Sequence, residues 1–134
     1  MRSASLFAFI LVLFSTSLFS CTEHQDMVPT PEEMLSRGNW SVDYYFAGQD
    51  QTAQYGNYRF SFKPDGSLSC DNNVHNCTGT WKIIKNVQSD VLDISLTTQQ
   101  PELQELNHDW TITASSLQSV TMTNGAEQLR LRKQ

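Results

Sequence analysis

Apolar and polar residues alternate along most of the chain from Asn39 onward. In the first such run, the apolar positions spaced two residues apart are Trp40, Val42, Tyr44 and Phe46. A period of two is typical of a β-strand that buries one face and leaves the other in water. The same pattern recurs and predicts about eight short strands, at residues 40–46, 58–63, 68–70, 77–85, 91–97, 110–112, 120–122 and 127–133.

The connections between these strands are short and carry turn residues. In Pro64-Asp65-Gly66, the proline fixes its own φ and the glycine tolerates a positive φ, as a tight turn requires. Asn124-Gly125 is a strong hairpin signal. Parallel strands need crossovers of roughly a dozen residues or more, so we expect an antiparallel sheet. The sequence therefore predicts an all-β fold, an eight-stranded antiparallel up-and-down barrel, with a two-sheet β-sandwich as the alternative.

A short helix is predicted immediately before the first strand. Thr30 is a good N-cap, Pro31 suits the first helical position, and Glu33 completes a capping box. Gly38 favours the left-handed conformation in which helices commonly end. The barrel domain is therefore assigned to residues 31–134, with this helix at its start.

The first residues of the chain have the pattern of an export signal. Arg2 gives a positive start, and residues 6–14 form an almost unbroken apolar run. Such a run fits the apolar segment of a signal peptide, commonly about 7–15 residues, and is shorter than the roughly 20 residues that span a bilayer. The segment Leu18-Phe19-Ser20-Cys21 resembles the lipobox of bacterial lipoproteins, in which the cysteine becomes the acylated first residue.

That resemblance implies a signal peptide at residues 1–20, lipidation at Cys21 and a tether at residues 21–30. It places the protein in the envelope of a Gram-negative bacterium, bound to the lipid bilayer through acylated Cys21. Thr22 is not the aspartate that retains some lipoproteins in the inner membrane, so the outer membrane is favoured and its face stays open. Cleavage after Ser17, which would release a soluble secreted protein, and an uncleaved membrane anchor are the alternatives.

The charge balance restricts the class of partner. The chain carries 9 Lys and Arg against 14 Asp and Glu, a formal net charge of −5. Binding to nucleic acid phosphates needs clustered basic side chains, and the basic run of the chain is confined to residues 130–133. Nucleic acid is therefore not expected as a partner.

Cys70 and Cys77 are the pair of cysteines left once Cys21 is lipidated. In an oxidising compartment, such a pair favours a disulfide. Two free thiols are one alternative. A zinc site with His75 is another, but structural zinc needs four ligands and only three are present locally. We therefore predict a disulfide and no metal site.

The segment Gly38-Asn39-Trp40 follows the predicted helix and opens the first strand, which resembles the Gly-x-Trp start of the lipocalins. Three further segments are similar to small lipocalin-like (calycin-type) lipoproteins of Gram-negative bacteria: Tyr58-Arg59-Phe60-Ser61-Phe62, Pro64-Asp65-Gly66 and Gly79-Thr80-Trp81. The resemblance covers residues 33–133. It implies that Trp40 lies at the closed end of the barrel and that Arg130 or Arg132 covers its ring through a cation–π contact.

Aromatic residues are the richest candidates for a binding site. A pocket for a small apolar ligand would be lined by Tyr44, Phe46, Tyr58, Phe60, Phe62, Trp81 and Trp110. The same residues equally fit a barrel whose interior is filled by side chains. The Gly48–Gly56 loop is long and polar, so it is a candidate lid or docking edge, and Tyr45 and Tyr55 are candidates for a protein-binding rim.

The sequence contains no arrangement typical of a catalytic site. Its paired carboxylates, Asp90 with Asp93 and Glu102 with Glu105, are interpreted as solubilising surface groups, and no Gly-x-Ser-x-Gly elbow accompanies the histidines. The expected function is non-enzymatic and needs no cofactor. We expect a membrane-anchored lipocalin-like lipoprotein that binds a small apolar ligand or an envelope protein. The alternative is a periplasmic enzyme inhibitor or immunity-type protein that acts through its loops.

Overall fold

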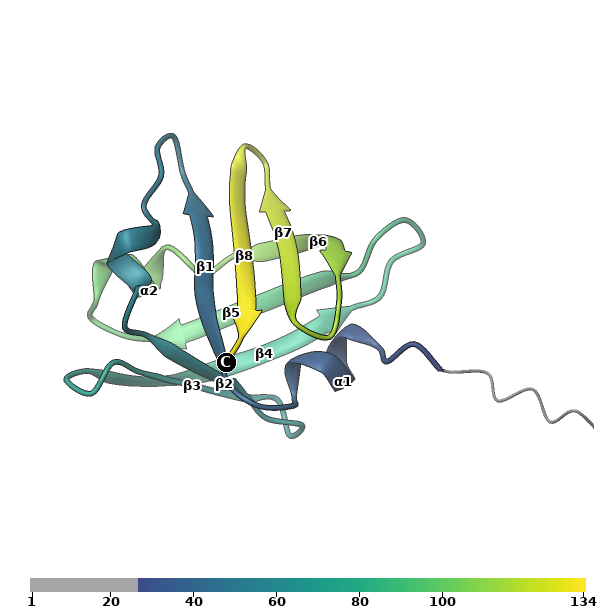
Figure 1. Ribbon diagram of the computed structural model, residues 1–134, viewed down its shortest axis with the longest axis horizontal. Coiled ribbons are helices and arrows are strands. Elements are labelled where there is room, and N and C mark those ends of the chain that lie inside the picture. The colour runs from purple at the N-terminus through teal and green to yellow at the C-terminus, as the bar shows by residue number, and fades with distance from the viewer. Residues whose placement is uncertain (1–26) are drawn as a thin grey trace, which may run out of the picture.

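The computed structural model describes residues 27–134, which form a closed barrel of eight antiparallel strands (Figure 1). The strands are β1 (Trp40–Phe46), β2 (Arg59–Phe62), β3 (Ser67–Asp71), β4 (Asn76–Ile84), β5 (Val91–Thr97), β6 (Asp109–Ser115), β7 (Ser119–Asn124) and β8 (Glu127–Lys133). Each strand pairs with the next, and β8 pairs with β1 to close the sheet. The predicted up-and-down barrel is confirmed, and the β-sandwich alternative is wrong. The signal peptide, Cys21 and residues 22–26 lie outside the described residues.

The predicted helix is α1 (Pro31–Leu35), which closes one end of the barrel, here called the α1 end. Its start has the expected capping box. The Glu33 N–H donates to Thr30 Oγ1 at 3.3 Å, and the Thr30 N–H donates to the Glu33 carboxylate at 3.1 Å. Leu35 is fully buried, and its carbonyl oxygen accepts a hydrogen bond from the Trp40 indole at 2.9 Å. This bond ties the helix to the first strand.

The opposite end, here called the α2 end, is closed by two helical turns that the alternating pattern does not predict. The 3₁₀ turn η1 (Thr52–Tyr55) follows β1, and α2 (Pro101–Gln104) follows β5. Together these segments bury Tyr55, Leu103 and Leu106 over the end of the barrel. Figure 1 shows α1 and α2 on opposite sides of the molecule. Within residues 27–134, no helix has the length and apolar character needed to cross a membrane.

A β-bulge in β1 decides which aromatic side chains face inward. The register of β1 on β8 shifts between Val42 and Tyr44, so Asp43 is an extra residue in the strand. Beyond the bulge Tyr45 is fully buried, whereas Tyr44 and Phe46 are partly exposed. The interpretation that Tyr44 and Phe46 point inward and Tyr45 outward is therefore wrong, because one extra residue exchanges the two faces of a strand.

Cys70 and Cys77 lie directly opposite each other in the β3–β4 hairpin and form a disulfide, with their Cα atoms 5.2 Å apart. The predicted disulfide is confirmed, and the free-thiol and zinc alternatives are wrong. Both side chains are buried in the core cluster. The bond therefore crosses the hairpin on the inner face of the barrel.

Gly79 lies at the centre of β4, where the backbone of β5 approaches so closely that no side chain fits. A Cβ atom at this position would overlap the Ser95 carbonyl oxygen and lie 2.8 Å from the Leu96 Cα. Glycine in a strand interior commonly marks such a close approach or a bend at a barrel corner. β4 can therefore pair with β5 at this point because Gly79 has no side chain.

We predict that Gly79→Ala lowers the free energy of unfolding by roughly 1–3 kcal/mol, because the backbone of β5 must shift to admit a methyl group. Urea unfolding followed by tryptophan fluorescence measures this. Gly56→Ala is the matched control, since its Cβ would meet no atom closer than 3.7 Å. It should change stability by less than about 1 kcal/mol. Equal stabilities of the two variants would contradict the prediction.

Candidate functional site

The barrel interior is the first candidate site, and the protein's own side chains occupy it. Five of the seven candidate lining residues are at most 7% exposed there: Tyr58, Phe60, Phe62, Trp81 and Trp110. The Phe62 and Trp81 rings meet edge to face with their centroids 5.4 Å apart. The Tyr45 ring lies 5.2 Å from Tyr55 and 6.3 Å from Trp110 in similar geometry. Such contacts are favourable packing between the rings themselves.

The tryptophans are additionally fixed by hydrogen bonds to the ends of the barrel. Trp40 donates to the Leu35 carbonyl oxygen, as described above. The Trp81 indole N–H donates to the Lys63 carbonyl oxygen at 2.9 Å, in the β2–β3 turn. The Trp110 indole N–H donates to the Leu106 carbonyl oxygen at 3.0 Å, after α2. A ligand that entered the interior would have to displace rings whose polar atoms already have partners, and each broken buried hydrogen bond costs about 1–3 kcal/mol.

Three tyrosines and two glutamates join the segments that close the α2 end, and we call this group the tyrosine–glutamate cap. The Tyr58 hydroxyl donates to the Glu102 carboxylate at 2.8 Å, and the Tyr55 hydroxyl donates to the Glu102 carbonyl oxygen at 2.6 Å. The Tyr45 hydroxyl donates to the Glu105 carboxylate at 3.2 Å. The cap therefore connects η1 and β1 to the α2 segment across the mouth of the barrel.

The electrostatics of the cap favour neutral tyrosines. Burial, and then the hydrogen bond to Glu102 and its charge, raise the pKa of Tyr58 to about 12. Burial, and then the charges of Glu127 and Glu105, raise the pKa of Tyr45, and burial also raises the pKa of Tyr55. A phenol with such a pKa keeps its proton near neutral pH and acts as a hydrogen-bond donor. The arrangement suits a structural closure better than proton transfer.

Sequence reasoning missed the cap. Glu102 and Glu105 were interpreted as solubilising groups, yet both accept hydrogen bonds from buried tyrosines. The Gly48–Gly56 loop was a candidate lid with Tyr45 and Tyr55 at a binding rim, but both rings are fully buried and η1 packs on β1. The rim interpretation is therefore wrong. The available signal was Tyr55 itself, an aromatic residue in an otherwise polar loop.

Arg130 and Arg132 lie on the outer face of β8, because they alternate with Leu129 and Leu131, which are buried. Both pair with Asp43, at 2.6 Å from Arg130 Nε and 3.1 Å from Arg132 Nε. The partial burial of Asp43 works against ionisation, but these two hydrogen-bonded guanidinium groups outweigh it and lower the pKa of the carboxyl group.

The expected cation–π contact with Trp40 is also corrected. In the described residues, the cation–π contact of Arg130 is instead with Tyr44, on the outside of the barrel. The Arg130 guanidinium lies 5.7 Å from the centre of the Tyr44 ring. Trp40 is fully buried and packs under α1 instead. The contact with Trp40 does not form because the Trp40 ring points into the barrel and both arginines point out of it. The bulge at Asp43 turns Tyr44 outward, where its ring meets Arg130.

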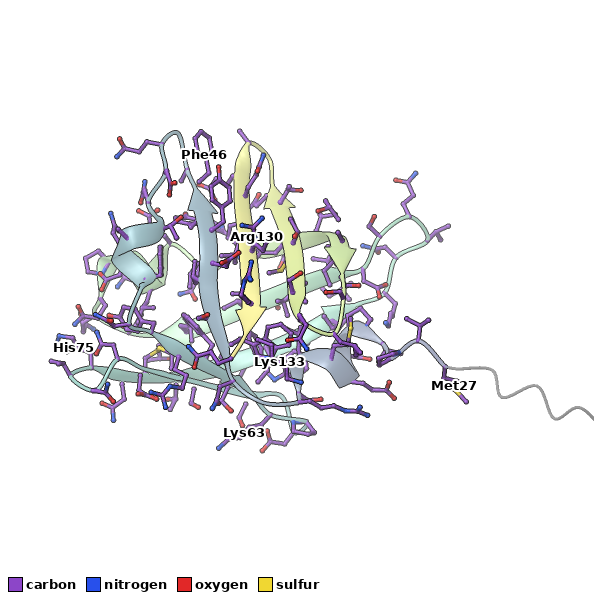
Figure 2. The ribbon with its side chains drawn as sticks, viewed as in Figure 1. Met27, Phe46, Lys63, His75, Arg130 and Lys133 are labelled. Carbon is purple, nitrogen blue, oxygen red and sulfur yellow. A yellow bond between two sulfur atoms is a disulfide. The ribbon has the colours of Figure 1, made fainter. Side chains whose placement is uncertain are left out.

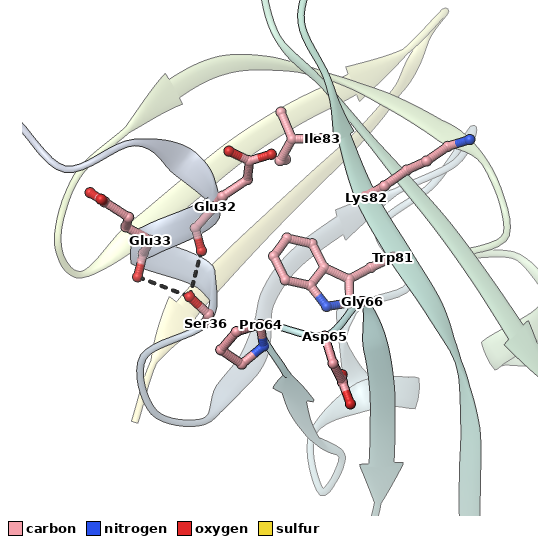
Figure 3. Close-up of a pocket in the computed structure, with 9 residues that line it drawn as sticks. All are labelled: Glu32, Glu33, Ser36, Pro64, Asp65, Gly66, Trp81, Lys82 and Ile83. Carbon is pink, nitrogen blue, oxygen red and sulfur yellow. Dashed lines mark hydrogen bonds between the residues drawn. The ribbon is translucent and has the colours of Figure 1, made fainter.

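The wall of the barrel carries a hollow of about 440 Å³ between α1, the β2–β3 turn and β4 (Figure 3). Its floor is the Trp81 ring, and the acidic Glu32, Glu33 and Asp65 are among its lining residues. The Lys82 side chain points away from the Trp81 ring, and its ammonium group lies 3.7 Å from the Asp93 carboxylate. On the α1 side, the Ser36 hydroxyl donates to the Glu32 carbonyl oxygen at 2.7 Å, which fixes the end of the helix. The hollow is open to solvent, so it suits a segment of a partner better than an enclosed small molecule.

Within the described part of the chain, no group of three or more His, Cys, Asp or Glu side chains is placed to hold a metal ion. Glu127, at the start of β8, has a carboxylate oxygen, Oε2, that is buried and has no hydrogen-bond partner among the described residues. Its charge contributes to the raised pKa of Tyr45.

Comparison with known proteins supports the fold. A solved structure of similar fold is that of a DUF4847 family protein from Bacteroides vulgatus. The two align with a TM-score of 0.58 and 16% sequence identity, over 77% of this chain and 98% of that chain. No family model matches the chain, and no curated protein matches it. At this identity the similarity shows a shared barrel fold alone.

We predict that the protein loses stability as the pH rises above about 10, the ordinary pKa of tyrosine. Folding raises the pKa of Tyr58 to about 12. The neutral phenol therefore contributes its full stabilisation below the pKa of the unfolded chain, and this stabilisation is lost as the pH rises toward the pKa of the folded protein. Tyr58→Phe should therefore flatten the fall of unfolding free energy with pH. Denaturant unfolding at a series of alkaline pH values measures this slope, and an unchanged slope would contradict the assignment.

Proposed function

We propose that this chain is a non-enzymatic, lipid-anchored envelope protein of a Gram-negative bacterium, whose filled barrel binds an envelope protein through its outer surface. The observation that carries the proposal is the filled interior. Core aromatic rings touch one another, all three tryptophan N–H groups have internal partners, and both ends are closed. A barrel built in this way offers its wall and loops for recognition.

The small apolar ligand, the other half of the expectation, has less support. Ligand pockets are commonly about 300–1,000 Å³ and enclose most of the ligand surface. The hollows described here lie on the outside of the barrel and are open to solvent. The Trp81 hollow combines an aromatic floor with charged rims, which is a composition typical of protein interfaces. We therefore favour a protein partner and take this hollow as its candidate contact.

We infer a lipocalin-type barrel from the start of the domain. Gly38 has φ of 82°, a conformation that suits glycine, and leads directly from α1 into β1. Trp40 is buried at that end, against α1. The position of the Gly-x-Trp segment at a helix-closed end supports the resemblance, while the outward arginines depart from it.

Lipid anchoring is inferred from the lipobox-like segment that ends at Cys21. The described chain begins with Met27, Val28 and Pro29 at the α1 end and enters α1 directly. A short tether followed at once by a folded domain is the arrangement expected of a protein held at a membrane by its first residue.

The inhibitor alternative requires an exposed loop that can enter an enzyme. The Gly48–Gly56 loop, a candidate docking edge, is anchored in the core by Tyr55, whose hydroxyl donates to the Glu102 carbonyl oxygen. We therefore do not adopt this alternative.

We predict that Cys21→Ser moves the protein from the membrane fraction to the soluble fraction of the envelope, because a lipoprotein is held by acyl chains on that cysteine. The intact mass of the unsubstituted protein should equal residues 21–134 plus acyl groups. Fractionation with immunoblotting and intact-mass analysis test both statements. A Cys21→Ser protein that stays in the membrane fraction would contradict lipid anchoring.

We predict that the Cys21→Ser protein, purified gently from the envelope, shows only its polypeptide mass in native mass spectrometry. Packed aromatic and aliphatic side chains occupy the interior of the described barrel, so a small apolar molecule would have to displace them. An added mass that solvent extraction removes would contradict the filled-barrel proposal and identify a cargo. This result would leave lipid anchoring intact, since the two depend on different parts of the chain.

A further inference from the structure

Large aliphatic side chains are exposed at three separate tips of the α1 end. Met27 and Val28 are 89% and 86% exposed where the described chain begins, Val87 is fully exposed in the β4–β5 loop, and Leu117 is 59% exposed in the β6–β7 turn. Single exposed aliphatics are ordinary on protein surfaces, but a group gathered at one end commonly marks an interaction site. These four residues are called the apolar tips below.

Topology brings the tips to the same end. In an up-and-down barrel, alternate connections lie at the same end, so the β4–β5 loop, the β6–β7 turn and the start of β1 are neighbours. Met27, Val28 and Leu117 also line one hollow of about 340 Å³, together with Pro29, Met34 and two serines. Figure 1 shows the β4–β5 loop and the N-terminal segment projecting to the same side of the molecule.

The segments around the apolar tips carry no charge. They are Met27–Thr30, Asn86–Ser89 and Ser115–Ser119, and every residue in them is apolar or an uncharged polar residue. An ionised side chain is costly to bring into the region between headgroups and acyl chains, whereas a single aliphatic on a polar loop enters it readily. The composition of these segments therefore suits contact with a bilayer interface.

The charge of the two ends also differs. The α2 end carries the carboxylates of the tyrosine–glutamate cap and of Glu127, which anionic headgroups would repel. At the α1 end, the acidic Glu32, Glu33, Asp65 and Asp90 are balanced by the basic Arg37, Lys63, Lys85 and Lys133. Lys85 pairs with Asp90 at 2.8 Å. The α1 end is therefore the less acidic of the two.

The length of the chain before Met27 limits where a membrane can be. Met27 follows Cys21 by six residues, and an extended chain covers at most roughly 3.3–3.6 Å per residue. An acylated Cys21 would therefore hold Met27 within roughly 20 Å of the bilayer surface. The tether leaves from the same end that carries the apolar tips, so that end must be the one facing the membrane.

We propose that the α1 end docks on the phospholipid bilayer by inserting the apolar tips between the headgroups, so that the barrel is held in one orientation. The proposal rests on the lipid anchor of the proposed function and deepens it. The occupant of this surface is the membrane to which the same chain is tethered.

The test uses the full acylated protein bound to vesicles of phosphatidylethanolamine and phosphatidylglycerol. Leu117→Cys and Val87→Cys are each labelled with an environment-sensitive fluorophore. Val74→Cys is the matched control, since Val74 is a 77% exposed aliphatic in the β3–β4 turn at the α2 end. Figure 2 shows its neighbour His75 on the side of the molecule opposite Met27. The native Cys70 and Cys77 are bonded to each other and do not react with the label.

We expect the emission at positions 117 and 87 to shift to the blue on vesicle binding and the emission at position 74 to stay as in water. Docking is overturned if all three positions respond alike, or if none responds while the protein floats with the vesicles. In those cases the lipid anchor still stands. If the protein does not float with the vesicles, the anchor fails, and docking fails with it.

Discussion

The pairing of β8 with β1 is the constraint on which the rest of the structure depends, because it closes the sheet into a barrel. Two local features accompany the closure. Asp43 adds one residue to β1 as a bulge, which increases twist and bends the strand. Gly79 lets β4 and β5 approach where a side chain would collide. The closed sheet then encloses a fixed volume that side chains must fill.

Aromatic rings occupy much of that volume, and the tryptophan rings donate hydrogen bonds to the segments that close the two ends of the barrel. Each tryptophan would leave a buried N–H without a partner if the segment that accepts its hydrogen bond moved away. Closure of the ends and packing of the core are therefore one cooperative feature. Because packed side chains occupy the interior, our proposals place recognition outside the barrel, on the Trp81 hollow and on the apolar tips.

The sequence predicts those features that depend on near neighbours. Alternation predicted about eight strands, the capping box predicted α1, and the pair of cysteines other than Cys21 predicted the disulfide. The errors arise from longer-range effects. The bulge at Asp43 leaves no local signal, and it exchanges the inner and outer faces of β1. The hydrogen bond between Tyr58 and Glu102 joins residues 44 positions apart, so neither residue alone predicts the cap.

The α1 end of the barrel carries the apolar tips, and the α2 end carries the acidic cap. This difference matters because the proposed tether leaves from the α1 end. Each of the four exposed apolar side chains is worth about 1.5–3 kcal/mol when fully buried, so their insertion would favour one orientation of the barrel on the bilayer. A lipid anchor roughly 20 Å away would make this contact intramolecular, because the tips would then meet the surface at high effective concentration. Under the proposal, the acyl chains supply the membrane affinity and the tips select one orientation of the barrel. The acidic cap would then face away from the membrane, and the Trp81 hollow, which α1 and the β2–β3 turn line, would lie on the membrane-proximal part of the barrel.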